Sequence, residues 1–173
     1  MKKLWNMLCD KIYDIFFAKS VAKVCDEFEH EDRCRLQYRF IPELVFGITA
    51  GKVSVDDFLD IDSWKATLSK DSREGFLFRW EELGVEKHIV DDGCTVILLS
   101  FPKPISAPEA LYCAVLVDDR IKIATYYTLE LSATGEYVLG SITPDMHFYF
   151  GKLKNPEKEL FLSWVITQRL VNA

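Results

Sequence analysis

The sequence predicts an α+β fold, with an antiparallel sheet of four or five strands from the C-terminal half and helices packed mainly on one face. Three observations predict it. Four short apolar runs rich in β-forming residues lie between residues 94 and 142, and an aromatic run follows at 147–150. The gaps between these runs are too short for parallel crossovers, which need a dozen or more residues. The residues before and after this block instead show helical spacing of apolar side chains.

The N-terminal segment is expected to form an amphipathic helix from residue 3 to about 30, packed on the body. Apolar residues recur there every three or four positions, as Leu8, Ile12 and Ile15 illustrate. Charged residues such as Asp10 interrupt the apolar run, and no unbroken stretch approaches 18 residues. A signal peptide and a membrane-spanning segment are therefore not expected.

The other elements follow from capping and turn signals in chain order. Further helices are expected from Pro42 to Gly51, at Val55–Leu59 after Ser54, at Trp64–Leu68 after Ser63, and at Arg73–Leu83 before Gly84. Strands are expected at Cys94–Phe101, Leu111–Val117, Ile121–Leu131, Tyr137–Ile142 and 147–150, and a final helix at 156–171. The whole chain, 1–173, is interpreted as one domain, mainly helical over 1–84, with the sheet over 94–150.

Strand pairing predicts which side chains share a face. If Leu131 pairs with Glu136, then Tyr127 and Leu129 face the helices, and the alternate residues form the opposite, exposed face. We expect that exposed face and a neighbouring acidic turn to bind a partner. The predicted partner-binding residues are Tyr126, Thr128, Glu130, Tyr137, Asp118 and Asp119.

Composition narrows the classes of function. The net charge is −6, and the 21 basic residues are scattered, so nucleic-acid binding is not expected. Acidic residues gather in several places, including Asp91-Asp92 and Asp118-Asp119. Most such runs are solvated faces or helix caps, and the alternative is an acidic docking surface for a basic protein. Five cysteines with no C-x-x-C pair predict reduced thiols in the cytoplasm.

The sequence suggests one candidate site for acid–base catalysis. His147 and Tyr149 project to one side of a strand, where imidazole can act as a base and phenol as a proton donor. With Glu130 they support an alternative interpretation, in which the protein is a small hydrolase or transferase. The competing interpretation of His147 and Tyr149 is an ordinary edge strand with a half-buried histidine. The spacing of Cys25, His30 and Cys34 does not match a zinc site, so no metal is expected. Because the common phosphate, dinucleotide and nucleophile motifs are absent from the sequence, no cofactor is expected either.

The segments 126–130, 137–140 and 147–151, followed by a Pro-initiated helix, resemble a group of small uncharacterised bacterial cytosolic proteins over residues 111–165. That resemblance implies a fold and a cytosolic location but no reaction. Small size, acidity and missing catalytic motifs favour a non-enzymatic protein-binding module of immunity type or regulatory type. The sequence leaves the partner and the oligomeric state open.

Overall fold

The computed structural model describes residues 2–71 and 75–171, with side chains from residue 6 onward. Its centre is a six-stranded antiparallel sheet in which the strands lie in chain order, β1 to β6. The strands are β1 Gly84–Asp91, β2 Cys94–Ser100, β3 Ala110–Asp118, β4 Ile123–Leu131, β5 Tyr137–Ile142 and β6 His147–Lys152. The helices are α1 Lys2–Arg35, α2 Ile41–Thr49, α3 Val55–Phe58, α4 Ile61–Asp71 and α5 Lys158–Val171. The α+β class is therefore confirmed.

The expected number of strands is wrong, because the sheet has six. The additional strand is β1, which begins at Gly84, where a helix was expected to end. Residues 75–79 are not helical, and Trp80–Glu82 forms only a 3-10 turn; positions 73 and 74 of the expected helix lie outside the described residues. The dipeptide Asp92-Gly93, with Gly93 at φ 91°, joins β1 to β2. An Asp-Gly pair is a strong hairpin signal, since glycine reaches positive φ without strain.

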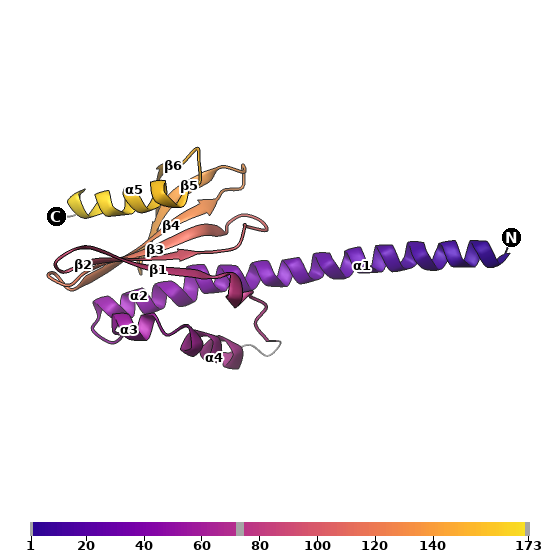
Figure 1. Cartoon of the computed structure of the whole chain (residues 1–173), viewed down its shortest axis with the longest axis horizontal. Coiled ribbons are helices and arrows are strands. Elements are labelled where there is room, and N and C mark those ends of the chain that lie inside the picture. The colour runs from indigo at the N-terminus through magenta and orange to yellow at the C-terminus, as the bar shows by residue number, and fades with distance from the viewer. Residues whose placement is uncertain (1, 72–74, 172–173) are drawn as a thin grey trace.

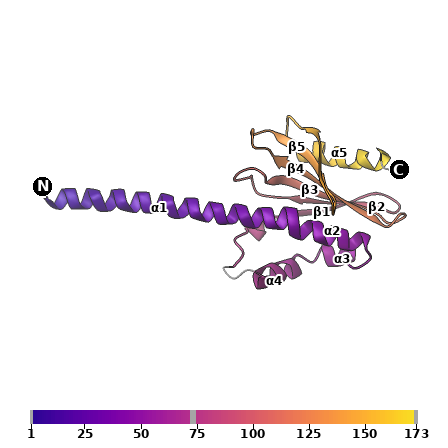
Figure 2. The same cartoon turned by 180° about the vertical axis from the view of Figure 1, so that it is seen from behind.

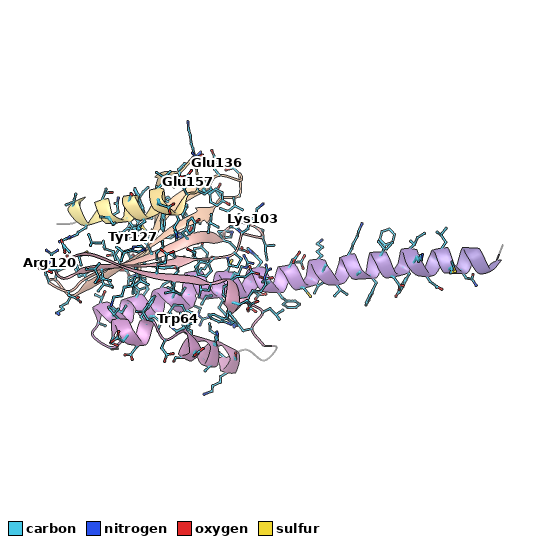
Figure 3. The ribbon with its side chains drawn as sticks, in the orientation of Figure 1. Trp64, Lys103, Arg120, Tyr127, Glu136 and Glu157 are labelled. Carbon is cyan, nitrogen blue, oxygen red and sulfur yellow. The ribbon has the colours of Figure 1, made fainter. Side chains whose placement is uncertain are left out.

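Helices cover both faces of the sheet, not mainly one (Figure 1). On one face the end of α1, with α2, α3 and α4, forms a core that includes Trp64 and Tyr126. On the other face α5 packs Phe161 and Val165 against Tyr127. Figure 3 labels Trp64 and Tyr127 on these opposite sides. Adjacent side chains of β4 are therefore both buried, Tyr126 with 0% and Tyr127 with 2% of the surface exposed.

The hairpin of β4 and β5 differs by one residue from the expected register. Leu131 lies opposite Tyr137, not Glu136. The loop is one residue longer than expected, because Ser132 N donates to Glu136 O at 2.8 Å and Gly135 takes φ 81°. Since side chains alternate along a strand, this shift exchanges the two faces of β5.

The first helix does not end near residue 30. It continues to Arg35 and passes through a π-helical segment, Leu36–Phe40, directly into α2. Pro42 has no N–H, and Ile41 N donates to Leu36 O, so the regular pattern of helix bonds is broken. The carbonyl of Gln37 is released by this change and accepts a hydrogen bond from Tyr126 Oη at 2.9 Å. This break therefore joins the helix to the centre of the sheet.

Beyond the body, α1 projects as a single free helix (Figures 1 and 2). We call its residues 6–28, all of which are exposed, the arm. The expectation that this helix packs on the body is therefore wrong over most of its length. Within the described residues, no helix is both long and apolar enough to span a membrane.

Candidate functional site

The residues predicted to bind a partner are placed very differently from one another. Tyr126, Thr128 and Glu130 lie under the helix layer with at most 3% of their surface exposed. The expectation that this face is exposed is wrong, because helices cover both sides of β4. Tyr137 is half-buried. The turn residues Asp118 and Asp119 remain accessible, half-buried and exposed respectively.

The structure does bring together the three residues of the predicted acid–base site. His147 Nε2 lies 3.3 Å from Glu130 Oε2, and Tyr149 Oη lies 3.4 Å from His147 Nδ1. The rings of His147 and Tyr149 stack with centroids 4.5 Å apart. The hydroxyls of Tyr38 and Thr128 each donate to Glu130 Oε2 at 3.0 Å. The result is a line of polar groups from exposed Tyr149 inward to a buried carboxylate.

A glycine makes this approach possible. Gly140 on β5 lies between His147 on β6 and Thr128 on β4. A Cβ atom at residue 140 would lie 2.8 Å from Thr128 Oγ1 and 3.0 Å from His147 Nε2. Because real Cβ atoms essentially never come within 3.0 Å of another heavy atom, a side chain at residue 140 would displace Thr128 and crowd the imidazole of His147.

The electrostatics of this cluster favour an ionised carboxylate beside neutral phenols. Burial alone would raise the pKa of Glu130, but the hydrogen bond and charge of His147, with the hydroxyls of Tyr38 and Thr128, lower it overall. Burial and the charge of Glu130 raise the pKa of Tyr38 and that of Tyr149. Both phenols therefore stay protonated at neutral pH and act as donors.

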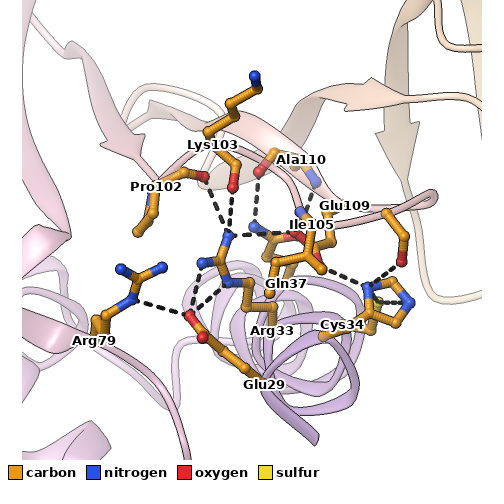
Figure 4. A network of polar contacts seen from close by, with 12 residues as sticks. Glu29, Arg33, Cys34, Gln37, Arg79, Pro102, Lys103, Ile105, Glu109 and Ala110 are labelled. Atoms are coloured by element: carbon orange, nitrogen blue, oxygen red, sulfur yellow. Dashed lines mark hydrogen bonds and ion pairs between the residues drawn. The ribbon is translucent and has the colours of Figure 1, made fainter. Parts of the chain in front are cut away.

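A second polar cluster fixes the inner end of α1 to the loop between β2 and β3 (Figure 4). Arg33 is fully buried, and its Nε and Nη2 donate to Glu29 Oε1 at 3.2 and 2.7 Å. Its Nη1 donates to the carbonyls of Pro102 and Lys103 at 3.3 and 2.9 Å, and to Glu109 Oε2 at 3.3 Å. We call residues 29–37 of this helix the root.

Glu109 is the acidic centre of this cluster and has 0% of its surface exposed. Its Oε1 lies 2.6 Å from His30 Nδ1, and its Oε2 also accepts a hydrogen bond from Ile105 N at 2.9 Å. Gln37 uses both ends of its amide to bond the backbone of Ala110, at 2.9 and 2.8 Å. The root is therefore held by a loop and by a strand at once, which fixes the direction of the arm.

Cys34, His30 and Glu109 lie together in the order of a thiol–imidazole–carboxylate triad, but their geometry is not catalytic. Cys34 Sγ is almost equally far from the two ring nitrogens of His30, at 3.8 and 4.0 Å, so it lies against the ring and not on a nitrogen lone pair. The thiol instead donates to Pro108 O at 3.4 Å. Burial and nearby carboxylates raise the pKa of Cys34 to about 11, which opposes a reactive thiolate.

In the part of the chain with described side chains, no group of three or more His, Cys, Asp or Glu side chains could hold a metal ion.

The arm carries an extended exposed apolar surface. Ten large apolar side chains on it have 44–70% of their surface exposed: Met7, Leu8, Ile12, Tyr13, Ile15, Phe16, Phe17, Val21, Val24 and Phe28. At about 100° per residue, Leu8, Ile12 and Ile15 fall on one side of the helix, and Phe17, Val21 and Val24 fall on the opposite side. The apolar period thus changes phase between residues 16 and 17, so the arm has two apolar faces.

A second accessible apolar surface lies where the β3–β4 turn meets the end of α5. A cavity of about 860 Å³ opens there, with Leu116, Ile121, Ile123 and Leu170 among its lining residues. We call it the groove. Asp91 and Asp118 also line it, one from each of two neighbouring turns.

Sequence reasoning missed the residues that connect helix and sheet. Tyr38, Gln37 and Glu109 are separated from their partners by 73 or more positions. No local pattern could have identified them. The change of apolar phase in the arm, by contrast, was present in the sequence as a readable signal.

A comparison with protein-family models, curated proteins and solved structures finds no match. The resemblance to small bacterial cytosolic proteins therefore stays a prediction. Function is inferred from the residues and their geometry.

Proposed function

We propose that this protein is a non-enzymatic protein-binding module whose binding element is the arm. One observation carries the proposal: ten large apolar side chains project into solvent from a single helix. Full burial of such a side chain is worth roughly 1.5–3 kcal/mol, and extended exposed apolar patches mark interaction sites. An immunity-type or regulatory role, in which binding itself is the function, agrees with this proposal.

The arm is suited to the helix-in-groove mode of recognition. The root fixes its base through buried contacts to the loop before β3, so the arm is already ordered before it binds. A helix that is ordered in advance loses less entropy on binding than a segment that must fold. Because the two apolar faces lie on opposite sides, a partner groove can bury one face, and only a partner that encloses the helix buries both.

The uneven distribution of charge along the chain indicates what kind of surface the partner has. The first 23 residues carry five lysines and two aspartates, a net charge of +3, whereas the rest of the chain has 16 basic and 25 acidic residues, a net charge of −9. Asp26 and Glu27 lie at the inner end of the arm. We call residues 6–23 the outer arm, which shares this positive charge with Lys2 and Lys3. A groove with an apolar floor and an acidic rim is therefore the surface that suits the outer arm.

Affinity capture from the native cell, followed by mass spectrometry, tests this function. The bait is the full chain, compared with a double variant, Ile12→Glu with Phe17→Glu, which changes one residue on each apolar face. Asn6→Glu is the matched control, because it places the same charge at an exposed polar position of the helix. We expect the wild type and the control to retain the same partner, and the double variant to lose it. Equal recovery with all three baits would contradict the proposal.

A second candidate function rests on the contacts among Tyr149, His147 and Glu130. In a hydrolase or transferase, Glu130 would orient the imidazole, and His147 would accept a proton from Tyr149 or from a bound nucleophile. The test is a screen of ester and phosphoester substrates with wild type, His147→Gln and Tyr149→Phe. Turnover that both substitutions abolish would favour this function over the binding module. Turnover that persists in both would eliminate it.

A further inference from the structure

We infer that the groove receives the outer arm of a second copy of this chain. This inference rests on the proposed function, because it takes the arm as the binding element and names its partner. The groove and the arm are two separate apolar surfaces, and neither is covered in the described chain.

The groove has an apolar lining that remains open to solvent. Ile121, Ile123 and Leu170 keep 58%, 45% and 78% of their surface exposed, although they border one cavity of about 860 Å³. Leu116 of β3, which is buried with 6% exposed, also lines the cavity. The lining therefore offers space and apolar contact for side chains of the size of Leu8, Ile12 and Ile15.

The rim of the groove is acidic. Asp91-Asp92 and Asp118-Asp119 are brought together by β-sheet pairing, because Asp119 N donates to Gly93 O at 2.8 Å. Two arginines are also present, but each is paired with an aspartate of the rim. Arg120 pairs with Asp118 at 3.0 Å, and Arg169 pairs with Asp91.

Both Asp92 and Asp119 are exposed at this rim. Exposed Lys122 lies in the same turn, between Ile121 and Ile123. Four carboxylates therefore stand against three basic side chains, which leaves the rim with a net charge of −1. Together with Lys2 and Lys3, the outer arm has the opposite charge, +3, and it bears the apolar face of Leu8, Ile12 and Ile15. Opposite charge favours the encounter of the two surfaces, and apolar contact stabilises the complex once it has formed.

The groove cannot be filled by the arm of its own chain. The arm leaves the body at one end, and Arg120 marks the end farthest from it (Figure 3). If the arm of one copy binds the groove of another, the two copies make a head-to-tail contact. Such a contact forms a ring if the rotation closes, or a growing chain if it does not.

Sedimentation velocity over a concentration series tests the inference with the full chain. We expect the wild type to form species larger than a monomer that increase with concentration. Ile12→Glu in the arm and Ile121→Glu in the groove should each give a monomer. Both residues are exposed, so circular dichroism should show that both variants stay folded. Asn6→Glu and Ile89→Glu are the matched controls, since Ile89 is 77% exposed but lies outside the groove, and both should associate like the wild type.

A mixing experiment distinguishes arm–groove contact from arm–arm contact. The Ile12→Glu chain keeps an intact groove, and the Ile121→Glu chain keeps an intact arm. Mixed together, the two monomers should form a one-to-one heterodimer that grows no further. A mixture that stays monomeric while the wild type associates would overturn the inference, as would association that survives Ile121→Glu.

A wild type that is monomeric at all concentrations would also overturn it. If a different protein is then still captured in an arm-dependent manner, the proposed binding function stands without the second copy. If nothing is captured through the arm, both proposals fail.

Discussion

The arm and the root belong to one continuous helix, yet they reverse the usual distribution of side chains. In the arm, large apolar residues such as Phe16 and Phe17 keep 65% and 60% of their surface exposed. In the root, Arg33 has none of its surface exposed and bonds to buried Glu109. Hydrophobic character alone would predict the opposite assignment.

The difference teaches that surroundings, more than residue type, decide burial along this helix. The root lies beside a loop that supplies two carbonyls and a carboxylate to buried Arg33. Asp32, also buried, accepts a hydrogen bond from Leu77 N. The arm has no such neighbour, so its apolar groups stay in water. We interpret the root as the fixed part of the helix and the arm as the part that awaits a partner.

The largest loss of stability is predicted for a substitution that removes the contacts of the root. Glu109→Ala removes the carboxylate beside buried Arg33 and His30, so the buried guanidinium keeps its pairing with Glu29 but loses its second carboxylate. Breaking a buried ion pair in this way costs about 3–5 kcal/mol. Urea denaturation should show this loss in the free energy of unfolding. Glu136→Ala is the control, because Glu136 pairs with Lys152 on the surface, and it should change stability little. Similar losses in both variants would contradict the role given to the root.

A second substitution tests the close approach at Gly140. Gly140→Ala forces Thr128 or His147 to move, and overpacking of this kind costs about 1–3 kcal/mol. We also expect the imidazole of His147 to lose its contact with Glu130. The measurement is the thermal unfolding midpoint together with the NMR chemical shifts of His147. Unchanged imidazole shifts would show that residue 140 does not control this contact.

The pH dependence of stability tests the buried carboxylate of Glu130. Its pKa in the folded state is lowered below the unfolded value of roughly 4.3. Its contribution is therefore fully present above that value and is lost as the pH falls through the folded pKa. Glu130→Gln should lower stability at pH 7 by about 1–3 kcal/mol and by less in acid, in parallel urea titrations. A difference between the two proteins that stays constant down to pH 3 would refute this description.

The smallest effect on stability is expected for a substitution in the arm. Ile12→Glu changes an exposed residue with no buried partner in the body, so the free energy of unfolding of a monomeric sample should change by less than about 0.5 kcal/mol. Chemical denaturation at low protein concentration is the measurement. A loss as large as that of Glu109→Ala would mean that the arm packs on its own body.

Local signals in the sequence predicted much of the fold but little of the site. The hairpins of β2 to β5 could be read from alternation and turn residues, whereas β1 was missed although Asp92-Gly93 marks its turn. Strand geometry predicted that His147 and Tyr149 share a face, and they are in contact. Glu130 was part of the alternative site, and the structure places it beside His147. Tyr38, which completes that cluster, reaches Glu130 only because a π-helical segment and the sheet meet there.

The sequence by itself determined the α+β class, the antiparallel hairpins, the C-terminal helix and the two apolar phases of the arm. All of these depend on residues that are near one another in the chain. Only the tertiary structure decided that both faces of β4 are buried, that Arg33 and Glu109 are inside while the arm is outside, and that two acidic turns border one groove. These features depend on contacts between distant segments, and the same side chain is stabilised inside or outside according to the groups that those segments bring to it.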